Sequence, residues 1–567
     1  MMERSGFLRR AGAMALTAAL TLSVPALAAE PTQNRQEDLD RLMTGLETAH
    51  PNLFANTPES VFKARKAEIE TRLSTESDVE FLFDLQSLTA LAGDSHTGVP
   101  VAGKIVEQVT AYPMALSWRD GKWYLTTAPA EHQDLLGTQV TAVNGRDMEE
   151  IVTAFGQVLS ADNPVKLRRQ YRQVCNVADY YTYLNLAEEG RPLELTLAEG
   201  GTLSLAAVPY TALGEQKIAQ LGAQIPSPAT AWQEKTYCAF ALTPDTYYIQ
   251  YNACREDPDL PMETFASQVQ RDLDGGDYGR ILIDLRNNGG GSDGVIWPLL
   301  TLLRQELDRG TEVVGLIGET TFSSAIINAV ELQEMGIPLV GDLTSGSVDH
   351  FGSVGSFQLP NSGIQVQVSS KYIDLGTLLD ADAGRGVEPL EPDVLVRQTM
   401  ADTLAGRDTA VEWLLAHPER LVQTAYPNAP LTRGRFLGQL HQALGAPKAA
   451  QKAPFQDLLG VEWYLPAVNW AAETGITLGT ADGRLAAART VSWQECAQFL
   501  VRAVQDHSPG LVRAAPLPTA LAEAPWGREA LEQVWQWGLL PEDADFTQPP
   551  TRDQGEAMAK ALSKLGT

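Results

Sequence analysis

The chain has 567 residues, a formal net charge of −28 at pH 7 and 44% hydrophobic residues. This length indicates about three domains, with enough apolar residues for a core in each. A surface this acidic argues against nucleic acid or an anionic membrane as partners. The four cysteines lack metal-binding spacing and are too few for a disulfide framework, although Cys238 and Cys254 flank a strand-like run and could pair in an oxidising compartment.

Residues 1–28 have the features of a secretory signal peptide. Arginines up to Arg10 precede an uncharged run from Ala11 to Ala29. Ala26-Leu27-Ala28 offers an A-x-A cleavage site, so we expect export, removal of the signal and no membrane attachment afterwards. The alternative is a retained anchor, because the run is about as long as a short membrane-spanning helix.

Residues 29–99 are predicted to form a helical N-terminal part. Apolar residues recur with helical spacing from Leu39 to Leu46 and again from Phe81 to Leu91. The second helix ends in the polar turn Gly93-Asp94-Ser95-His96-Thr97-Gly98. A lone histidine in such a turn is usually just an exposed residue, but a histidine is also the side chain best suited to act as a general base.

Residues 100–210 are predicted to form a β-rich insert. Met114–Trp118 and Lys122–Thr126 flank Arg119-Asp120-Gly121, which is a hairpin signal. The later passage from Gly137 to Gly145 is similar to the Gly-x-x-Val-x-x-Val-Asn-Gly sequence of PDZ-like domains. Modules of that kind bind an extended peptide by strand addition.

Residues 211–420 alternate between strand-like and helix-like segments and are predicted to form an α/β core. Its central stretch is the apolar run Ile281–Leu285 followed by Arg286-Asn287-Asn288-Gly289-Gly290-Gly291. The asparagines and glycines end the strand in a turn whose backbone N–H groups can face a ligand. Donors fixed in this way stabilise the oxyanion of acyl transfer, whereas the simpler interpretation is a glycine-rich strand-to-helix connection.

A serine-bearing turn follows the next predicted strand of the core, Val313–Ile317. Thr320-Thr321-Phe322-Ser323-Ser324-Ala325 opens a predicted helix, and further strands are predicted at Ile337–Val340 and Ile364–Val368. A serine at a helix start is usually an N-cap. It can also be a nucleophile where a base and oxyanion donors are close.

Together these motifs resemble the S41 serine peptidases, which include tail-specific, C-terminal processing and tricorn-like proteases. Members carry Asp-Leu-Arg-x-Asn-x-Gly-Gly, then a serine-bearing turn, then a Val-Gly-Glu-like strand. Here the order is Asp284–Gly290, Ser323 and Val340-Gly341-Asp342. The resemblance covers roughly residues 30–415. It implies a ClpP/crotonase-like α/β core that hydrolyses protein or peptide substrates through an acyl-enzyme, with no cofactor or metal.

The resemblance also implies which residues form the nucleophile and the oxyanion site. Ser323 would be the nucleophile, because its distance to the glycine after the helix matches the family. Ser324 is the alternative nucleophile. Its N–H would be one oxyanion donor, and Gly289 or Gly290 would supply the other.

The resemblance places the base on His96, because tricorn-like members carry a Ser-His pair at this point in the order, and Ser95 would help to orient it. Many other members use a lysine in a Gly-Lys-Gly turn, which this chain lacks, and His350 lies nearby as the alternative base. The glutamate of tricorn-like enzymes is also missing. Asp382 and Glu388 are candidates for that role. If these departures reflect decay, the chain would instead be an inactive peptide-binding or wall-scaffolding protein.

Residues 426–567 contain an internal repeat. Predicted helix starts at Arg433, Trp493 and Arg552 are separated by roughly 60 residues, and tryptophan-rich passages that include Trp463 and Trp526 precede the second and third. The repeats look like three S-layer homology motifs, all-α modules that bind anionic secondary polymers of Gram-positive cell walls. The resemblance implies a secreted, wall-attached protein whose polymer contacts would include these five residues, although Trp493 stands where the motif has arginine. The alternative is a helical domain without a ligand.

Overall fold

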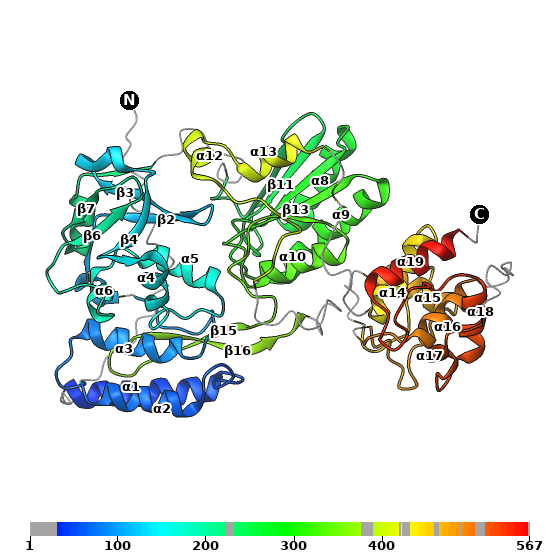
Figure 1. The fold of residues 1–567 in the computed structure, drawn as a ribbon, viewed down its shortest axis with the longest axis horizontal. Coiled ribbons are helices and arrows are strands. Elements are labelled where there is room, and N and C mark those ends of the chain that lie inside the picture. Colours follow the sequence, from blue (N-terminus) through cyan, green and yellow to red (C-terminus); the bar gives the residue numbers. More distant parts are fainter. Residues whose placement is uncertain are drawn as a thin grey trace. The chain divides into compact units, whose positions relative to one another are not determined.

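The computed structural model describes residues 31–101, 103–221, 232–375, 389–418, 421, 431–458, 464–487, 489–504 and 516–564. The chain divides into two compact units (Figure 1). Unit 1 contains the described part of Met1–Ser227 with Phe351–Tyr372 and Arg397–Glu412; unit 2 contains that of Pro228–His350, Ile373–Val396 and Trp413–Thr567. The predicted signal peptide lies outside the described residues. No helix within them combines the length and the hydrophobicity that a membrane crossing requires.

Unit 1 begins with three helices, α1 (Pro31–Ala49), α2 (Glu59–Glu70) and α3 (Asp78–Ala90). A capping box fixes the start of α3: the Ser77 hydroxyl accepts from the Glu80 N–H, and the Glu80 carboxylate accepts from the Ser77 N–H. The apolar spacings at Leu39–Leu46 and Phe81–Leu91 predicted α1 and α3 correctly.

The β-rich part of unit 1 is a seven-stranded antiparallel sheet, as far as the structure describes it. Its main path runs β2-β3-β4-β6-β7, with β5 beside β4 and β9 beside β3. Their bounds are β2 (Ala115–Arg119), β3 (Lys122–Pro129), β4 (Gln139–Val143), β5 (Arg146–Asp147), β6 (Leu193–Leu197), β7 (Thr202–Leu205) and β9 (Ile218–Gln220). Helices α4 (Met148–Phe155), α5 (Pro164–Val174) and α6 (Ala178–Tyr183) lie between β5 and β6 in the sequence, and β1 (Thr110–Ala111) pairs with β8 (Val208–Pro209). The predicted hairpin at Arg119-Asp120-Gly121 is the β2–β3 connection.

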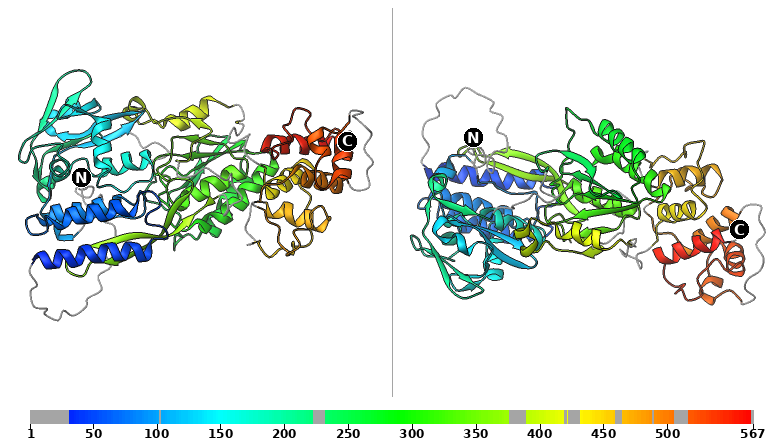
Figure 2. Two further views of the ribbon diagram at one scale, coloured as in Figure 1. Left: turned by 60° about the horizontal axis from the view of Figure 1, so that its bottom comes forward. Right: turned by 90° about the horizontal axis from the view of Figure 1, so that it is seen from above.

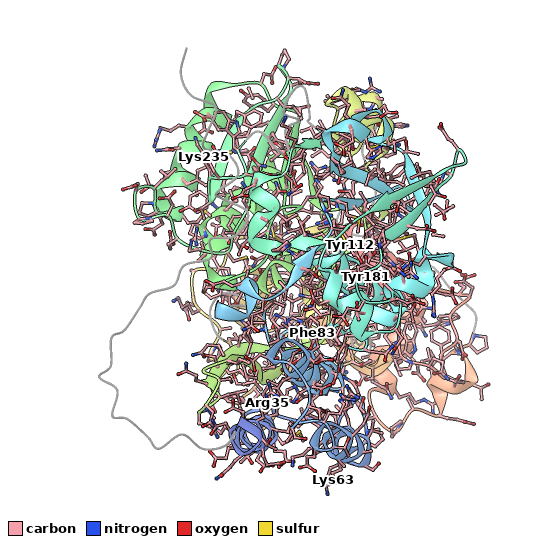
Figure 3. All side chains as sticks on the ribbon, turned by 90° about the vertical axis from the view of Figure 1, so that its left-hand side faces the viewer. Arg35, Lys63, Phe83, Tyr112, Tyr181 and Lys235 are labelled. Carbon is pink, nitrogen blue, oxygen red and sulfur yellow. The ribbon has the colours of Figure 1, made fainter. Side chains whose placement is uncertain are left out.

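Aromatic side chains join α3 to the insert in one core. The ring of Phe83 stacks on Tyr180 at 4.1 Å between centroids, and Tyr181 contacts Tyr112 edge-on at 5.9 Å. Figure 3 labels Phe83, Tyr112 and Tyr181 in this region. The N-terminal helices and the insert thus fold as one body, because they share a hydrophobic core.

The hairpin of β15 (His350–Gln358) and β16 (Gln365–Ile373) corrects one prediction. The strand expected at Ile364–Val368 exists, but it pairs with β15 and not with the core sheet. Asp38 of α1 accepts from the N–H groups of Asn361 and Ser362 at the hairpin turn, both at 2.8 Å. Figure 2 shows the hairpin alongside α1. The physical reason is that β16 buries Val366 and Val368 on one face only, whereas a central parallel strand is buried on both.

Unit 2 contains a six-stranded sheet in the order β10-β11-β12-β13-β14-β17. The strand β10 (Tyr237–Ala241) is antiparallel to β11 (Thr246–Tyr251), and the other neighbours are parallel: β12 (Arg280–Asp284), β13 (Glu312–Ile317), β14 (Leu339–Gly341) and β17 (Val394–Leu395). Helices α8 (Met262–Gly275), α9 (Trp297–Arg309) and α10 (Ser324–Glu334) follow β11, β12 and β13 in turn. This alternation confirms the predicted α/β core. After β17 the chain forms two further helices, α12 (Met400–Ala405), which belongs to unit 1, and α13 (Thr409–Ala416).

The C-terminal part is helical and confirms the three predicted helix starts. Its helices are α14 (Arg433–Ala443), α15 (Leu465–Glu473), α16 (Trp493–Val504), α17 (Thr519–Ala522), α18 (Arg528–Gln536) and α19 (Arg552–Ser563). Each repeat helix starts behind a hydroxyl cap, at Thr432, Ser492 or Thr551. The Leu431 N–H donates to the Pro550 carbonyl, and the Val491 N–H donates to the Leu431 carbonyl. The three starts are therefore hydrogen-bonded into one cluster.

Candidate active site

The strand β12 ends at a buried ion pair that starts the glycine turn. The Asp284 carboxylate accepts from Nη2 of Arg286 at 2.6 Å and from the Arg286 N–H at 2.8 Å, and the Tyr248 hydroxyl also donates to it. Asp284 is 1% exposed, so this charge is neutralised by a side chain two residues further on. The pair fixes the direction in which the chain leaves the sheet.

The glycine turn itself, residues 287–291, has a conformation that requires glycine. Gly290 has a φ of 98° and Gly291 a φ of 141°. A Cβ on Gly291 would lie 2.1 Å from the Cys254 carbonyl oxygen. The Cys254 N–H donates to the Gly290 carbonyl, and the Cys254 carbonyl accepts from the Ser292 N–H at 2.7 Å. Cys254, which follows β11, therefore holds the turn in place by two backbone hydrogen bonds.

Ser323 lies on a strained turn between β13 and α10. Its φ of 55° and ψ of −129° fall where residues with a side chain are rarely found. It occupies the N-cap position of α10, yet its side chain makes no capping hydrogen bond. Ser323 is half-buried, whereas Ser324 is buried and its hydroxyl donates to the Gly291 carbonyl at 2.8 Å. The two candidate nucleophiles thus differ: one hydroxyl lies outside any capping interaction, and the other is tied to the glycine turn.

The glycine turn and the serine turn are in direct contact. A Cβ on Gly290 would lie 2.8 Å from Cβ of Ser323 and 3.1 Å from the Ser324 nitrogen. The Phe322 N–H donates to the Asn288 carbonyl at 3.1 Å. The structure therefore brings Gly290 of the predicted oxyanion turn against both candidate nucleophiles, Ser323 and Ser324.

The backbone donors beside Ser323 differ from the predicted set in one respect. The N–H of Gly290 donates to Oδ1 of the Asn288 side chain at 2.9 Å, so it is already engaged. Within the described part of the chain, no acceptor takes a hydrogen bond from the N–H of Gly289, Gly291 or Ser324. These three N–H groups can therefore still donate to a ligand, whereas that of Gly290 is taken by Asn288.

A third turn supports the serine turn, and the alternative base follows it. The Gly346 N–H donates to the Thr321 carbonyl, and the Thr321 hydroxyl donates to the Leu285 carbonyl at 2.9 Å. His350 is 2% exposed, and its Nδ1 lies 3.0 Å from the Ser347 carbonyl oxygen. Since a carbonyl can only accept, Nδ1 of His350 carries the proton.

His96 belongs to unit 1, where a buried network holds its turn. The Asp94 carboxylate accepts from the His96 N–H at 2.9 Å and from the Thr97 hydroxyl at 2.5 Å. Nε2 of His50 lies 3.3 Å from the second Asp94 oxygen, and Nδ1 of His50 accepts from the Asn52 N–H. His96 is 9% exposed, and its Nδ1 lies 3.9 Å from Oδ1 of Asp94. Burial raises the pKa of Asp94, but hydrogen bonds from His50, Ser369 and Thr97 outweigh burial and lower it.

Asp94 is a buried carboxylate beside His96 that the sequence analysis did not single out. Its Oδ1 lies 3.9 Å from Nδ1 of His96. Its signal in the sequence was its position two residues before His96. The predicted candidates for the acidic member, Asp382 and Glu388, lie outside the described residues.

The Ser95 side chain is hydrogen-bonded to Asp162. Its hydroxyl donates to Oδ1 of Asp162 at 2.5 Å and accepts from the Asp162 N–H at 3.1 Å. The buried Lys166 on α5 lies within electrostatic range of both Asp162 and Asp94. Burial, aided by the charge of Arg169, lowers the pKa of Lys166 to about 7. Ser95 thus ties the His96 turn to the segment before α5, and a role in orienting His96 stays a prediction.

The residues predicted to bind wall polymer lie mostly in the interior of the repeats. Arg433 is 4% exposed and pairs with Glu495 at 2.6 Å. Arg552 pairs with Glu334 of α10 at 3.2 Å, and Arg435 also contacts this carboxylate. Nε1 of Trp493 donates to the Gln548 carbonyl. Trp526 is 48% exposed, and Trp463 lies outside the described residues. The arginines stabilise the repeats and their contact with α10, so of the described candidates Trp526 is the one presented to solvent.

Neither a disulfide between the two cysteines considered above nor a metal-binding group is found in the described part of the chain. Cys238 and Cys254, the pair considered for a disulfide, are both free thiols. No group of three or more potential metal ligands occurs among the described residues.

Comparisons with known proteins give fold similarity at low identity. No protein-family model and no curated protein matches the chain. Mature CPAF complexed with lactacystin has 15% identity and a TM-score of 0.45, covering 68% of this chain and 98% of that chain. The photosystem II D1 C-terminal processing protease has 15% identity and a TM-score of 0.31, covering 66% and 98%. A lipoprotein from Streptococcus agalactiae has 12% identity and a TM-score of 0.30, covering 70% and 100%. Similarity at this level does not assign the chain to a family, so its function is inferred from the site.

Proposed function

We propose that this chain is a serine peptidase that cleaves protein or peptide substrates through an acyl-enzyme on Ser323. The observation that carries the proposal is the contact between two turns of unit 2. Ser323 stands at a strained helix start with no capping bond, and Gly290 of the glycine turn lies against it. Among the described residues, the N–H groups of Gly289, Gly291 and Ser324 in these two turns have no acceptor. A nucleophile next to preorganised N–H donors is the arrangement that acyl transfer requires.

The strain at Ser323 supports a catalytic role over a structural one. A serine that only caps a helix has extended backbone dihedrals and accepts a hydrogen bond from the first turn, as Thr432 and Thr551 do here. Ser323 has neither feature. Backbone strain of this kind costs about 1–3 kcal/mol and persists at functional sites.

The base in this proposal is His96, which rests on the sequence resemblance to tricorn-like enzymes. Its turn is rigid and buried, and Asp94 provides a carboxylate next to the imidazole. Asp94 is the acidic member that the resemblance left open. In the first step, the Ser323 oxygen attacks the scissile carbonyl carbon and its proton passes to the base. The base then returns the proton to the leaving amine, and water hydrolyses the ester.

The nucleophile is tested by a matched pair of substitutions, Ser323→Ala and Ser324→Ala. We expect Ser323→Ala to abolish both turnover and labelling by a fluorophosphonate probe, with a rate loss on the order of 10⁴ or more. Ser324→Ala loses one hydrogen bond to the Gly291 carbonyl but keeps its N–H, so its loss should be far smaller. Equal labelling of the wild type and Ser323→Ala would refute the assignment.

The base is tested by His96→Ala against His350→Ala. Labelling and turnover should disappear in the first variant and largely persist in the second. Near-normal turnover of His96→Ala would move the base to His350 or to a lysine such as Lys371. If folded wild-type protein were neither labelled nor active, the alternative of a non-catalytic peptide-binding protein would stand.

We also propose export and wall attachment, as the sequence suggests. The support is the Arg-flanked apolar leader of residues 1–28 and the threefold repetition of capped helices, whose starts hydrogen-bond to one another. Any binding of anionic polymer would use exposed groups such as Trp526, because Arg433 and Arg552 are paired inside the chain.

A further inference from the structure

Asn288 makes more connections between the elements of the site than any simple turn residue needs. It is 0% exposed. Its Oδ1 accepts from the Gly290 N–H at 2.9 Å, and its Nδ2 donates to the Tyr251 carbonyl at 3.1 Å. Its own carbonyl accepts from the N–H of Phe322, the residue before the proposed nucleophile. One residue thus joins the end of β11, the glycine turn and the serine turn.

These partners fix the orientation of the Asn288 amide. A backbone N–H can only donate and a backbone carbonyl can only accept, so Oδ1 must face Gly290 and Nδ2 must face Tyr251. No flipped amide satisfies both partners. A buried, fully specified polar group of this kind holds its surroundings in one arrangement, because breaking it leaves unpaired groups inside the protein.

The side chains of Cys254 and Asn328 support the Asn288 amide. Sγ of Cys254 lies 3.4 Å from Oδ1 of Asn288 and 3.3 Å from Oδ1 of Asn328. Burial raises the pKa of the Cys254 thiol to about 12, so it stays protonated and able to donate. Nδ2 of Asn328, on α10, donates to the Asp293 carbonyl at 3.0 Å and to Glu331 at 2.8 Å. The chain of contacts runs from α10 through Asn328 and Cys254 to Asn288.

The effect on the oxyanion donors follows from this geometry. Because Asn288 takes the Gly290 N–H, the peptide between Gly289 and Gly290 cannot rotate to offer that group to a ligand. The neighbouring N–H groups of Gly289 and Gly291 are left without an acceptor among the residues that the structure describes. The two backbone hydrogen bonds of Cys254 and the hydrogen bond from the Phe322 N–H to the Asn288 carbonyl then keep the glycine turn against Ser323.

We infer that Asn288, backed by Cys254 and Asn328, is the positioning residue that sets the oxyanion turn against the serine turn. Its role in catalysis rests on the proposed peptidase function, but its role in fixing the two turns does not. Asn288 acts through the backbone and does not itself bind the oxyanion.

The test compares Asn288→Ala with Asn287→Ala in the full-length protein. Asn287 is the adjacent asparagine; its Oδ1 accepts from Nε2 of Gln233, and its Nδ2 donates to Oδ1 of Asn252. Amide hydrogen exchange is followed by mass spectrometry in peptides that contain residues 286–292 and 320–326. In Asn288→Ala we expect exchange in both segments to accelerate by at least about tenfold, while Asn287→Ala leaves the 320–326 segment as in the wild type. Unchanged exchange in Asn288→Ala would overturn the inference.

Kinetics supply the readout that a merely structural role would not move. Asn288→Ala should lower kcat by on the order of 10²–10³, the loss seen when one oxyanion donor is removed, with KM within about threefold. A folded Asn288→Ala enzyme with wild-type kcat would also contradict the inference. If wild-type Ser323 proves unreactive while exchange still depends on Asn288, the peptidase proposal fails and the positioning role stands.

A second variant covers the case in which Asn288→Ala does not fold. Cys254→Ala removes one thiol and leaves both backbone hydrogen bonds of Cys254 in place. We expect it to fold and to speed exchange in residues 286–292 by a few-fold, because the Asn288 amide loses its backing. Exchange identical to the wild type would then be the refuting result.

Discussion

Replacing Gly290 by alanine tests whether the two turns of unit 2 touch as the structure shows. The added Cβ would lie 2.8 Å from both the Phe322 carbonyl oxygen and Cβ of Ser323, and 3.1 Å from the Ser324 nitrogen. Two of these atoms belong to the backbone of the serine turn and the third is a Cβ, so none is the end of a flexible side chain that could move away. The residue also has a φ of 98°, which an L side chain rarely adopts.

The cost has two parts. Holding a non-glycine residue in this conformation costs roughly 1–2 kcal/mol, and overpacking at a well-packed contact costs about 1–3 kcal/mol. We therefore expect Gly290→Ala to reduce the free energy of unfolding by about 2–5 kcal/mol. If the strain is relieved by separating the turns, a displacement of about 1 Å lowers the rate by on the order of 10².

Gly289→Ala is the matched control. A Cβ at Gly289 would meet nothing within 4 Å, and the residue is exposed. Its change in stability should stay within about 0.5 kcal/mol, and its N–H is retained. Urea denaturation would measure the stabilities, and fluorophosphonate labelling rates at Ser323 would report the site. Equal labelling rates for the two variants would show that Gly290 does not contact the serine turn, and the proposed oxyanion site would fall with it.

Three other predictions concern parts of the chain away from the glycine turn. The pKa of Asp94 is lowered in the folded chain, so the ionised carboxylate stabilises the fold at pH values above its ordinary pKa of 3.8, and this stabilisation is lost as the pH falls through the folded-state pKa. Asp94→Asn should therefore be destabilising at pH 7. The difference in stability between this variant and the wild type should disappear in acid, as measured by urea melts at a series of pH values. The pKa of Lys166 is lowered to about 7 from an ordinary 10.5, so the stability of the wild type rises with pH between these two values. Lys166→Met should therefore stabilise the chain by a few kcal/mol at pH 6 and by less at pH 10. Equal effects at both pH values would contradict the lowered pKa. A chain ending at Gln423 should no longer sediment with purified cell walls, while Trp526→Ala in the full chain should weaken sedimentation and leave peptide cleavage unchanged; full sedimentation of the truncated chain would exclude the repeats as the anchor.

Local signals explain why much of the fold was predictable. The start of α3 and the repeat helices depend on side chains within three residues of the cap, such as Ser77 with Glu80 and Thr551 with Gln554. Likewise, β12 and its turn are set by a contiguous apolar run, the Asp284–Arg286 pair and the glycines. Interactions this short are visible in the order of the residues.

Pairings over long sequence separations were not predictable in the same way. The strand at β16 was found, but not its partner, because alternation in the sequence does not say which surface will cover the apolar face. Here that surface is α1, more than 300 residues earlier in the chain. The same limit applies to the Gly290 N–H: the sequence shows a flexible turn, but only the folded backbone shows that Asn288 consumes this donor.

The choice of Asp94 as the proposed acidic partner of His96 shows most clearly what residue type and spacing leave open. Asp94 stands in the same turn as His96, yet carboxylates in polar turns are common and usually only solvated. What distinguishes Asp94 is its burial and its bonds to His50, at the end of α1, and to Thr97, whose hydroxyl in turn accepts from the Ser369 N–H of β16. The hairpin that the sequence assigned to the wrong sheet is thus the element that completes the support of the His96 turn. Any substitution that detaches β16 from α1 should therefore disturb His96, although neither element carries Ser323, His96 or Asp94.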